Sequence, residues 1–118
     1  MSRTIDVSTI RHLPVPAEHA FDACLAAIAQ RRAVGQERDQ GAYLIVDRPY
    51  CVAFEWHAAN AARADVVTVA LIDADPGCKI KVTQQLDVEH ASDAERVRKD
   101  WARMLDGMSR ALRARACA

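Results

Sequence analysis

The chain is poor in the residue types that most often carry binding or catalytic chemistry. Its 118 residues include only 5% aromatic side chains and four glycines, and its 16 basic and 16 acidic residues give a formal net charge of zero. A balanced charge lacks the basic footprint of a general nucleic-acid-binding protein, so we expect no nucleic-acid partner. The C-terminal residues Arg110, Arg113 and Arg115 are better interpreted as the solvated end of a helix.

Long apolar runs are also missing. A membrane-spanning helix needs roughly 18 or more consecutive apolar residues, and no segment of the sequence approaches that length. Residues 1–13 alternate in polarity and do not combine a basic segment with an apolar block, as a signal peptide does. We therefore expect no membrane partner and a cytoplasmic location.

The four cysteines are widely separated, at positions Cys24, Cys51, Cys78 and Cys117. They form no CxxC pair, and no cysteine–histidine group has the spacing of a zinc site. In a reducing compartment such cysteines serve as small hydrophobic side chains or are idle surface thiols. The sequence thus predicts no metal site and no other cofactor.

What the chain does contain is a regular patterning of polarity, punctuated by turns. Strict alternation predicts strands, and apolar residues at three- and four-residue steps predict helices. These patterns predict strands at 3–12, 42–46, 50–57, 65–72 and 79–88, and helices at 17–32 and 92–118. Strands joined by short turns pair antiparallel, and a terminal helix then covers one face of the sheet. Residues 1–118 are therefore predicted to form a single α+β domain.

The C-terminal helix gives the strongest of these signals. Ser92 followed by Glu95 is the pattern of a capping box, in which each side chain bonds a free N–H at the helix start. The apolar stripe of this helix is predicted to face the sheet, as is a shorter stripe on the first helix. The stripe residues are Val97, Trp101, Met104, Leu105, Met108 and Leu112 in the long helix, and Phe21, Cys24, Leu25 and Ile28 in the first.

Alternation also predicts which side chains of each strand face inward. In the first strand Ile5 and Val7 share one face, and a late change of phase is expected to turn Ile10 inward as well. In the last strand Gln84 lies in phase with the inward apolar residues, so we expect a buried amide, which needs hydrogen-bond partners. The inward sets are Tyr50, Val52, Phe54 and Trp56 in one central strand, and Ile80, Val82, Leu86 and Val88 around Gln84.

No group of residues makes a convincing catalytic site. Glu55 and His57 lie two apart in one strand, so they share a face, which is the minimal arrangement of a general base oriented by a carboxylate. That face is opposite to Phe54 and Trp56 and is expected to be solvated. We predict no catalytic residue.

Several segments resemble a known family. HLPVPAEHAFDACLAA is similar to the opening "apolar–Pro–hydrophilic–Val/Ala–Phe" of helix-grip proteins, the SRPBCC superfamily of START, Bet v 1, polyketide-cyclase and Hsp90-ATPase-activator-like domains. VDRPYCVAFEWHA resembles the "P-x-x-L-x-x-x-W" strand of the activator-homologue branch, through Pro49, Val52 and Trp56. DADPGCKIKVTQQL resembles its "GT-x-L-x-x-x-H/Q" hairpin, with Cys78 replacing threonine. DAERVRKDWARMLDGMSRAL resembles its closing "GW…ML…L…L", with Asp100 replacing glycine.

This resemblance implies a helix-grip fold: a curved antiparallel sheet of about five strands wrapped on a long C-terminal helix, with a short helix after the first strand. It also implies that a hydrophobic small molecule binds between sheet and helix, without catalysis. The residues expected to contact that molecule are Tyr50, Phe54, Trp56, Gln84, Trp101, Met104, Leu105 and Met108.

Two other functions remain open. Activator homologues act on protein partners, and this chain is shorter than the family pattern before Ala42, where relatives carry a further hairpin. A second copy covering the surface exposed by that difference would make a homodimer. A cyclase-type enzyme is the least favoured alternative, since the inward polar candidates Tyr50 and Gln84 are not ready bases at neutral pH.

Overall fold

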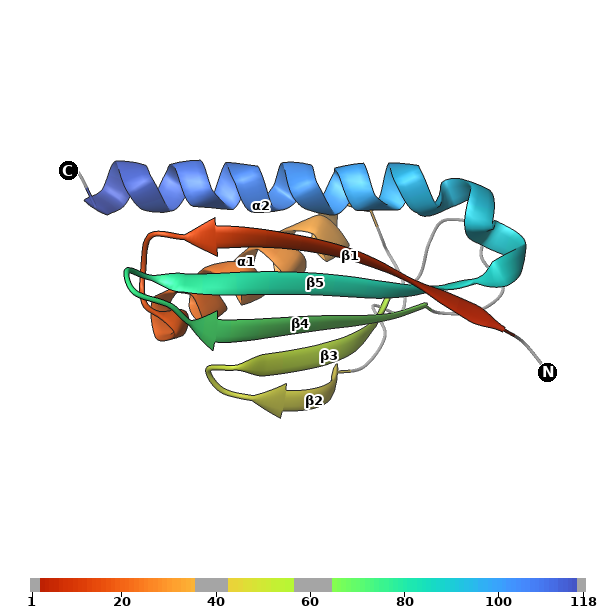
Figure 1. Ribbon diagram of the computed structural model, residues 1–118, viewed down its shortest axis with the longest axis horizontal. Helices are drawn as coiled ribbons and strands as arrows, with labels where there is room; N and C mark the ends of the chain where they lie inside the picture. Colours follow the sequence, from red (N-terminus) through yellow and green to blue (C-terminus); the bar gives the residue numbers. More distant parts are fainter. Residues whose placement is uncertain (1–2, 36–42, 57–64, 117–118) are drawn as a thin grey trace.

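In the computed structural model the chain forms one antiparallel sheet with two α-helices packed on it (Figure 1). The structure describes residues 3–35, 43–56 and 65–116. The predicted α+β helix-grip architecture is confirmed. In chain order the elements are β1 (Thr4–Leu13), α1 (Ala17–Gly35), β2 (Tyr43–Asp47), β3 (Cys51–Trp56), β4 (Asp65–Asp73), β5 (Cys78–Asp87), the 3₁₀-helix η1 (Val88–Asp93) and α2 (Ala94–Ala116).

The strands lie in the order β1-β5-β4-β3-β2, and every neighbouring pair is antiparallel. Strands β2 to β5 form a meander, because each pairs with the next strand along the chain. The first strand then adds beside the last, with a regular register from Thr4 opposite Asp87 to Leu13 opposite Cys78. This leaves β2 at one edge of the sheet and β1 at the other.

The inner face of the sheet and the two helices share one hydrophobic core. Strand β5 alternates strictly, with buried side chains at every second position from Cys78 to Leu86. The predicted stripes of both helices face this strand surface. The buried core residues include Phe21, Cys24 and Ile28 of α1, Val97, Trp101, Leu105, Met108 and Leu112 of α2, and Val52, Phe54, Val67, Val69, Leu71, Ile80 and Val82 of the sheet.

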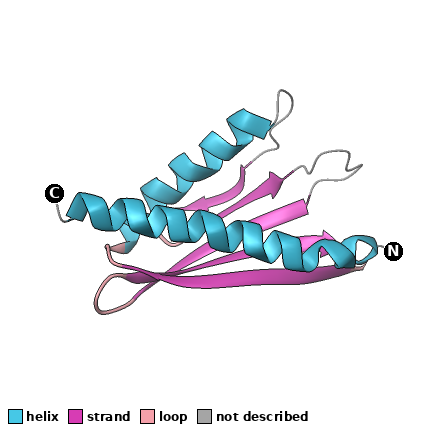
Figure 2. Ribbon diagram, turned by 90° about the horizontal axis from the view of Figure 1, so that it is seen from above, coloured by secondary structure: helices cyan, strands magenta, loops and turns pink. Residues whose placement is uncertain are grey.

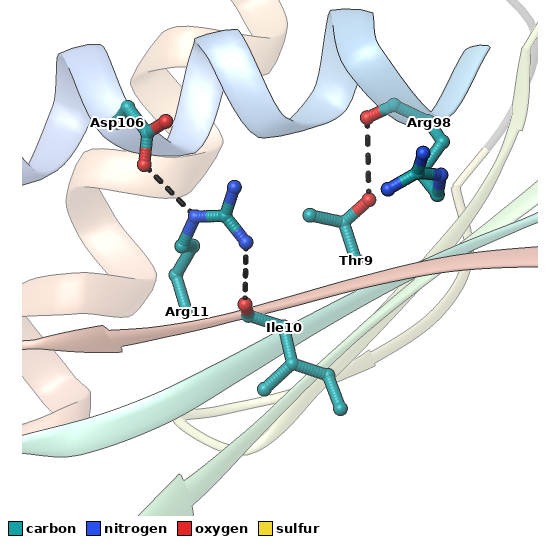
Figure 3. A network of polar contacts seen from close by, with 5 residues as sticks. All are labelled: Thr9, Ile10, Arg11, Arg98 and Asp106. Atoms are coloured by element: carbon teal, nitrogen blue, oxygen red, sulfur yellow. Dashed lines mark hydrogen bonds and ion pairs between the residues drawn. The ribbon is translucent and has the colours of Figure 1, made fainter. Parts of the chain in front are cut away.

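The predicted change of phase in β1 is wrong. Because β1 pairs with β5 without a bulge, its alternation continues, so Thr9 is buried while Ile10 is 55% exposed. Helix α2 supplies partners for the inward polar side chains (Figure 3). The Thr9 hydroxyl donates to the main-chain carbonyl of Arg98 at 3.3 Å, and Nε of Arg11 donates to Oδ1 of Asp106 at 2.9 Å. These contacts attach the helix along the edge strand.

The start of α2 also differs from the prediction. Ser92 lies inside η1, and the α-helix begins at Ala94. The first turn of η1 is capped by Asp87, whose carboxylate accepts a hydrogen bond from the Glu89 N–H at 2.9 Å. Glu95 forms an ion pair with Arg98 within the helix. The chain therefore enters α2 through a capped 3₁₀ turn, and Val88, expected at the end of the strand, is 44% exposed in that turn.

The two helices cover different parts of the sheet. Helix α2 packs mainly along β1, and α1 packs against β4 and β5. Figure 2 shows that they approach each other at the C-terminal end of α2 and diverge toward its N-terminal end. The two helices thus form a V over the sheet. The wide end of this V lies where β3 ends and β4 begins. Within the described residues, neither helix is apolar enough over a sufficient length to cross a membrane.

The turn between β4 and β5 requires glycine at position 77. Gly77 has φ +80°, and a Cβ there would lie 2.0 Å from the carbonyl oxygen of Leu13. We expect Gly77→Ala to lower the free energy of unfolding by about 1–3 kcal/mol, measured by urea denaturation. The control is Gly107→Ala in α2, where a Cβ meets nothing nearer than 3.9 Å, so helix propensity should raise stability by up to about 1 kcal/mol. If Gly77→Ala unfolds at the same urea concentration as the unmutated protein, this turn geometry is contradicted.

Candidate functional site

The most distinctive polar feature of the inner face is the side-chain amide of Gln84. It is 4% exposed, and both ends of the amide are hydrogen-bonded. Its Nε2 donates to Oδ2 of Asp65 at 2.7 Å, and its Oε1 accepts from Nε1 of Trp101 at 2.7 Å. We call these three residues the Gln84 network. A buried amide is stable here because donor and acceptor are both satisfied.

Three elements bring the network together. Gln84 is in the inward phase of β5 and lies opposite Val67 of β4. Asp65 is the first residue of β4, two positions before Val67, so it shares the inner face. Trp101 lies about two turns into α2 on its apolar stripe. The network therefore links two strands to the long helix at the wide end of the V.

An aromatic cluster of Phe54, Trp56 and Trp101 adjoins this network. Trp56 lies directly opposite Asp65 in the β3–β4 register, so their side chains are neighbours on one face. The Trp56 ring lies 5.5 Å from the Trp101 ring, centroid to centroid, at an interplanar angle of 56°. Its centroid is 5.9 Å from that of Phe54, in an edge-on arrangement at 67°. Phe54 and Trp101 are buried and Trp56 is half-buried, which makes Trp56 the accessible member of the cluster.

The other predicted contact residues take two kinds of position. Leu105 and Met108 are buried on α2, about one and two turns beyond Trp101, and Met104 is partly buried beside them. The prediction that Tyr50 faces inward is wrong: it precedes β3, is 45% exposed, and its hydroxyl donates to Oδ2 of Asp73 at 2.8 Å. The hydrogen bond to Asp73, together with its negative charge, raises the pKa of Tyr50.

Sequence reasoning missed Asp65, which the polarity pattern identifies only as the first residue of the predicted strand 65–72. The signal was present, since Asp65 falls in the same alternation as the inward residues Val67, Val69 and Leu71. His57 of the Glu55–His57 pair lies outside the described residues.

Two of the cysteines, Cys24 and Cys78, are buried in the core. Burial raises the pKa of Cys24 to about 12. Burial, and then the charge of Asp73, also raise the pKa of Cys78. A thiol reacts as its thiolate, so both side chains are poor nucleophiles near neutral pH. They act in this fold as buried hydrophobic groups, as the sequence predicted.

The hydrogen bond between Gln84 and Trp101 should be measurable as an energetic coupling. Gln84→Met and Trp101→Phe each remove one side of this buried hydrogen bond, so each should lower the free energy of unfolding by about 1–3 kcal/mol. The double variant should lose less than the sum by about 1 kcal/mol in urea denaturation. As a control, Gln84→Met combined with Leu112→Ala, further along α2, should be additive. Additivity in the first pair would show that this bond contributes nothing to stability.

Comparison with known proteins places this architecture in a family. Residues 16–113 match the family described as Activator of Hsp90 ATPase homolog 1-like protein. A search of curated proteins finds no similar sequence.

Solved structures share the fold at low sequence identity. A protein from Cytophaga hutchinsonii superposes with a TM-score of 0.74 at 14% identity, covering 97% of this chain and 97% of its own. A protein from Mesorhizobium loti gives 0.73 at 15% identity, covering 95% and 98%. An AHSA1-like protein from Rhizobium etli gives 0.64 at 16% identity, covering 91% and 81%. The chain therefore belongs to the Activator of Hsp90 ATPase homolog 1-like family, a branch of the helix-grip superfamily.

Proposed function

We propose that this protein binds a hydrophobic small molecule beside Trp56 and Trp101, between the sheet and α2, and that it does so without catalysis. The observation that carries the proposal is the aromatic cluster at the wide end of the V, with one half-buried tryptophan. Binding sites for small molecules are mainly apolar and contain a few fixed polar groups. The aromatic cluster and the Gln84 network together have this composition.

The geometry of the network favours binding over chemistry. Gln84 cannot take up or release a proton near neutral pH, and both ends of its amide are already engaged. The hydrogen bond that Gln84 accepts from Trp101 holds that ring in one orientation, and the fixed ring supports Trp56, the accessible member of the cluster. Fixed aromatic rings give large contact area with little loss of conformational entropy on binding.

A neutral fluorescent probe tests this proposal. N-phenyl-1-naphthylamine should bind saturably, with an increase in its own emission and a decrease in tryptophan emission. Trp56→Ala should weaken binding by about tenfold, because it removes a stacking surface worth about 1 kcal/mol or more. Ile72→Ala is the control, since Ile72 is 61% exposed on the outer face of the sheet and should leave the affinity unchanged. Absence of saturable binding, or equal weakening in both variants, would rule the proposal out.

A second candidate function is protein interaction through the edge strand β2. Three consecutive apolar side chains, Leu44, Ile45 and Val46, are 51%, 54% and 55% exposed on this strand. An edge strand presents unpaired main-chain groups that can add another strand. The occupant we propose is a second copy of this chain.

The second candidate predicts a homodimer that depends on β2. Light scattering after size-exclusion chromatography should give twice the chain mass for the parent and a single chain mass for Ile45→Lys, because a charge at the centre of β2 opposes pairing. Val88→Lys is a control at a 44% exposed position outside the sheet. A monomeric parent over the whole accessible concentration range would exclude this candidate.

A further inference from the structure

We infer that the ligand of this site is a cation, an amine carried on a planar apolar body. The inference rests on the proposed function and adds a chemical class to it. It comes from the charge of Asp65 and from the position of that carboxylate beside two indole rings.

Asp65 places a carboxylate directly beside the aromatic cluster, opposite Trp56. Its carboxylate is partly buried, yet within the described residues it forms no ion pair, and its contact is with the neutral amide of Gln84. Several other carboxylates of the described residues do have basic partners, whereas Asp73, like Asp65, contacts a neutral group. These pairs are Asp22 with Arg48, Asp93 with Arg96, Glu95 with Arg98, Asp100 with Arg103, and Asp106 with Arg11.

An uncompensated carboxylate in a partly apolar site selects for the charge of its ligand. Buried charges in proteins are normally paired, because removing them from water is unfavourable. Gln84 Nε2 bonds Oδ2 of Asp65 and leaves Oδ1 as an acceptor in the described part of the chain. A ligand N–H⁺ that donates to Oδ1 would form a charge-assisted hydrogen bond. An anionic ligand would be repelled by the same group.

The aromatic cluster adds to this selection. Trp56 is the cross-strand partner of Asp65, so a ligand stacked on Trp56 places a substituent next to the carboxylate. The ring centroid of Trp101 lies 5.5 Å from that of Trp56, so a second indole adjoins the accessible one. Cations within about 6 Å of an indole centroid are attracted by the ring, most strongly when partly desolvated. The carboxylate and the indoles therefore favour the same ligand: a planar apolar group bearing an ammonium.

Three naphthalene probes of similar size test the inference. They are 1-naphthylmethylamine, a cation; 1-ethylnaphthalene, its neutral isostere; and 1-naphthoate, an anion. Titrations followed by tryptophan quenching at low ionic strength should show the amine binding about tenfold more tightly than the neutral probe. The anion should bind most weakly of the three.

Two matched variants assign the preference to one carboxylate. Asp65→Asn removes the charge and keeps the shape, and it should bring the affinities of the amine and the neutral probe to within about twofold of each other. Asp106→Asn removes an acid that is paired with Arg11, and it should keep the tenfold preference. A tryptophan emission spectrum equal to that of the unmutated protein checks that each variant retains the fold.

The outcomes separate this inference from the proposed function. Equal binding of the amine and its neutral isostere by the parent would overturn the inference and leave hydrophobic binding intact. A preference for the anion, or an amine preference that survives Asp65→Asn, would also overturn it. No saturable binding of any of the three probes would remove the proposed function itself.

Discussion

The placement of the long helix on the sheet depends on a buried amide that joins β4, β5 and α2. Gln84 reaches Asp65 across the sheet and Trp101 across the sheet–helix boundary, each at 2.7 Å. Apolar packing alone would allow a helix to slide or rotate on the sheet, because dispersion contacts have little directionality. A directional hydrogen bond from the indole N–H fixes the rotation of α2, and the buried amide stays satisfied only in that arrangement.

The edge strand reinforces the same placement. Thr9 and Arg11, both inward in β1, bond the main chain of Arg98 and the side chain of Asp106 (Figure 3). These contacts hold α2 along β1, while α1 packs over β4 and β5. The helices consequently diverge over the end of the sheet where Trp56 and Asp65 lie opposite each other. The candidate site is thus a consequence of how the long helix is attached.

The sequence correctly predicted which side chains face the core where the local periodicity of a strand or helix decides it. The two-residue alternation of β5 placed Gln84 inward, and the helical spacing of α2 placed Trp101 toward the sheet, as observed. Where the position of a side chain depends on partners distant in the sequence, the prediction missed it or was wrong. Thr9 is inward because β1 pairs with β5 without a bulge, and the acceptor that satisfies its hydroxyl lies 89 residues later. Asp65 lies beside Trp56 and Gln84 because of the register between β3, β4 and β5. Tyr50 does not contribute to the site, and its hydroxyl bonds Asp73.

Hydrogen exchange of the Trp101 indole N–H, followed by NMR, tests the role of the amide most directly. The chain has two tryptophans, so two indole signals are expected, and Trp56→Phe assigns them. The account predicts that the Trp101 signal exchanges at least about tenfold more slowly than that of an exposed indole, and that Gln84→Met removes this protection. Exchange at the rate of an exposed indole, or protection that persists in Gln84→Met, would contradict the claim that Gln84 holds α2 in place.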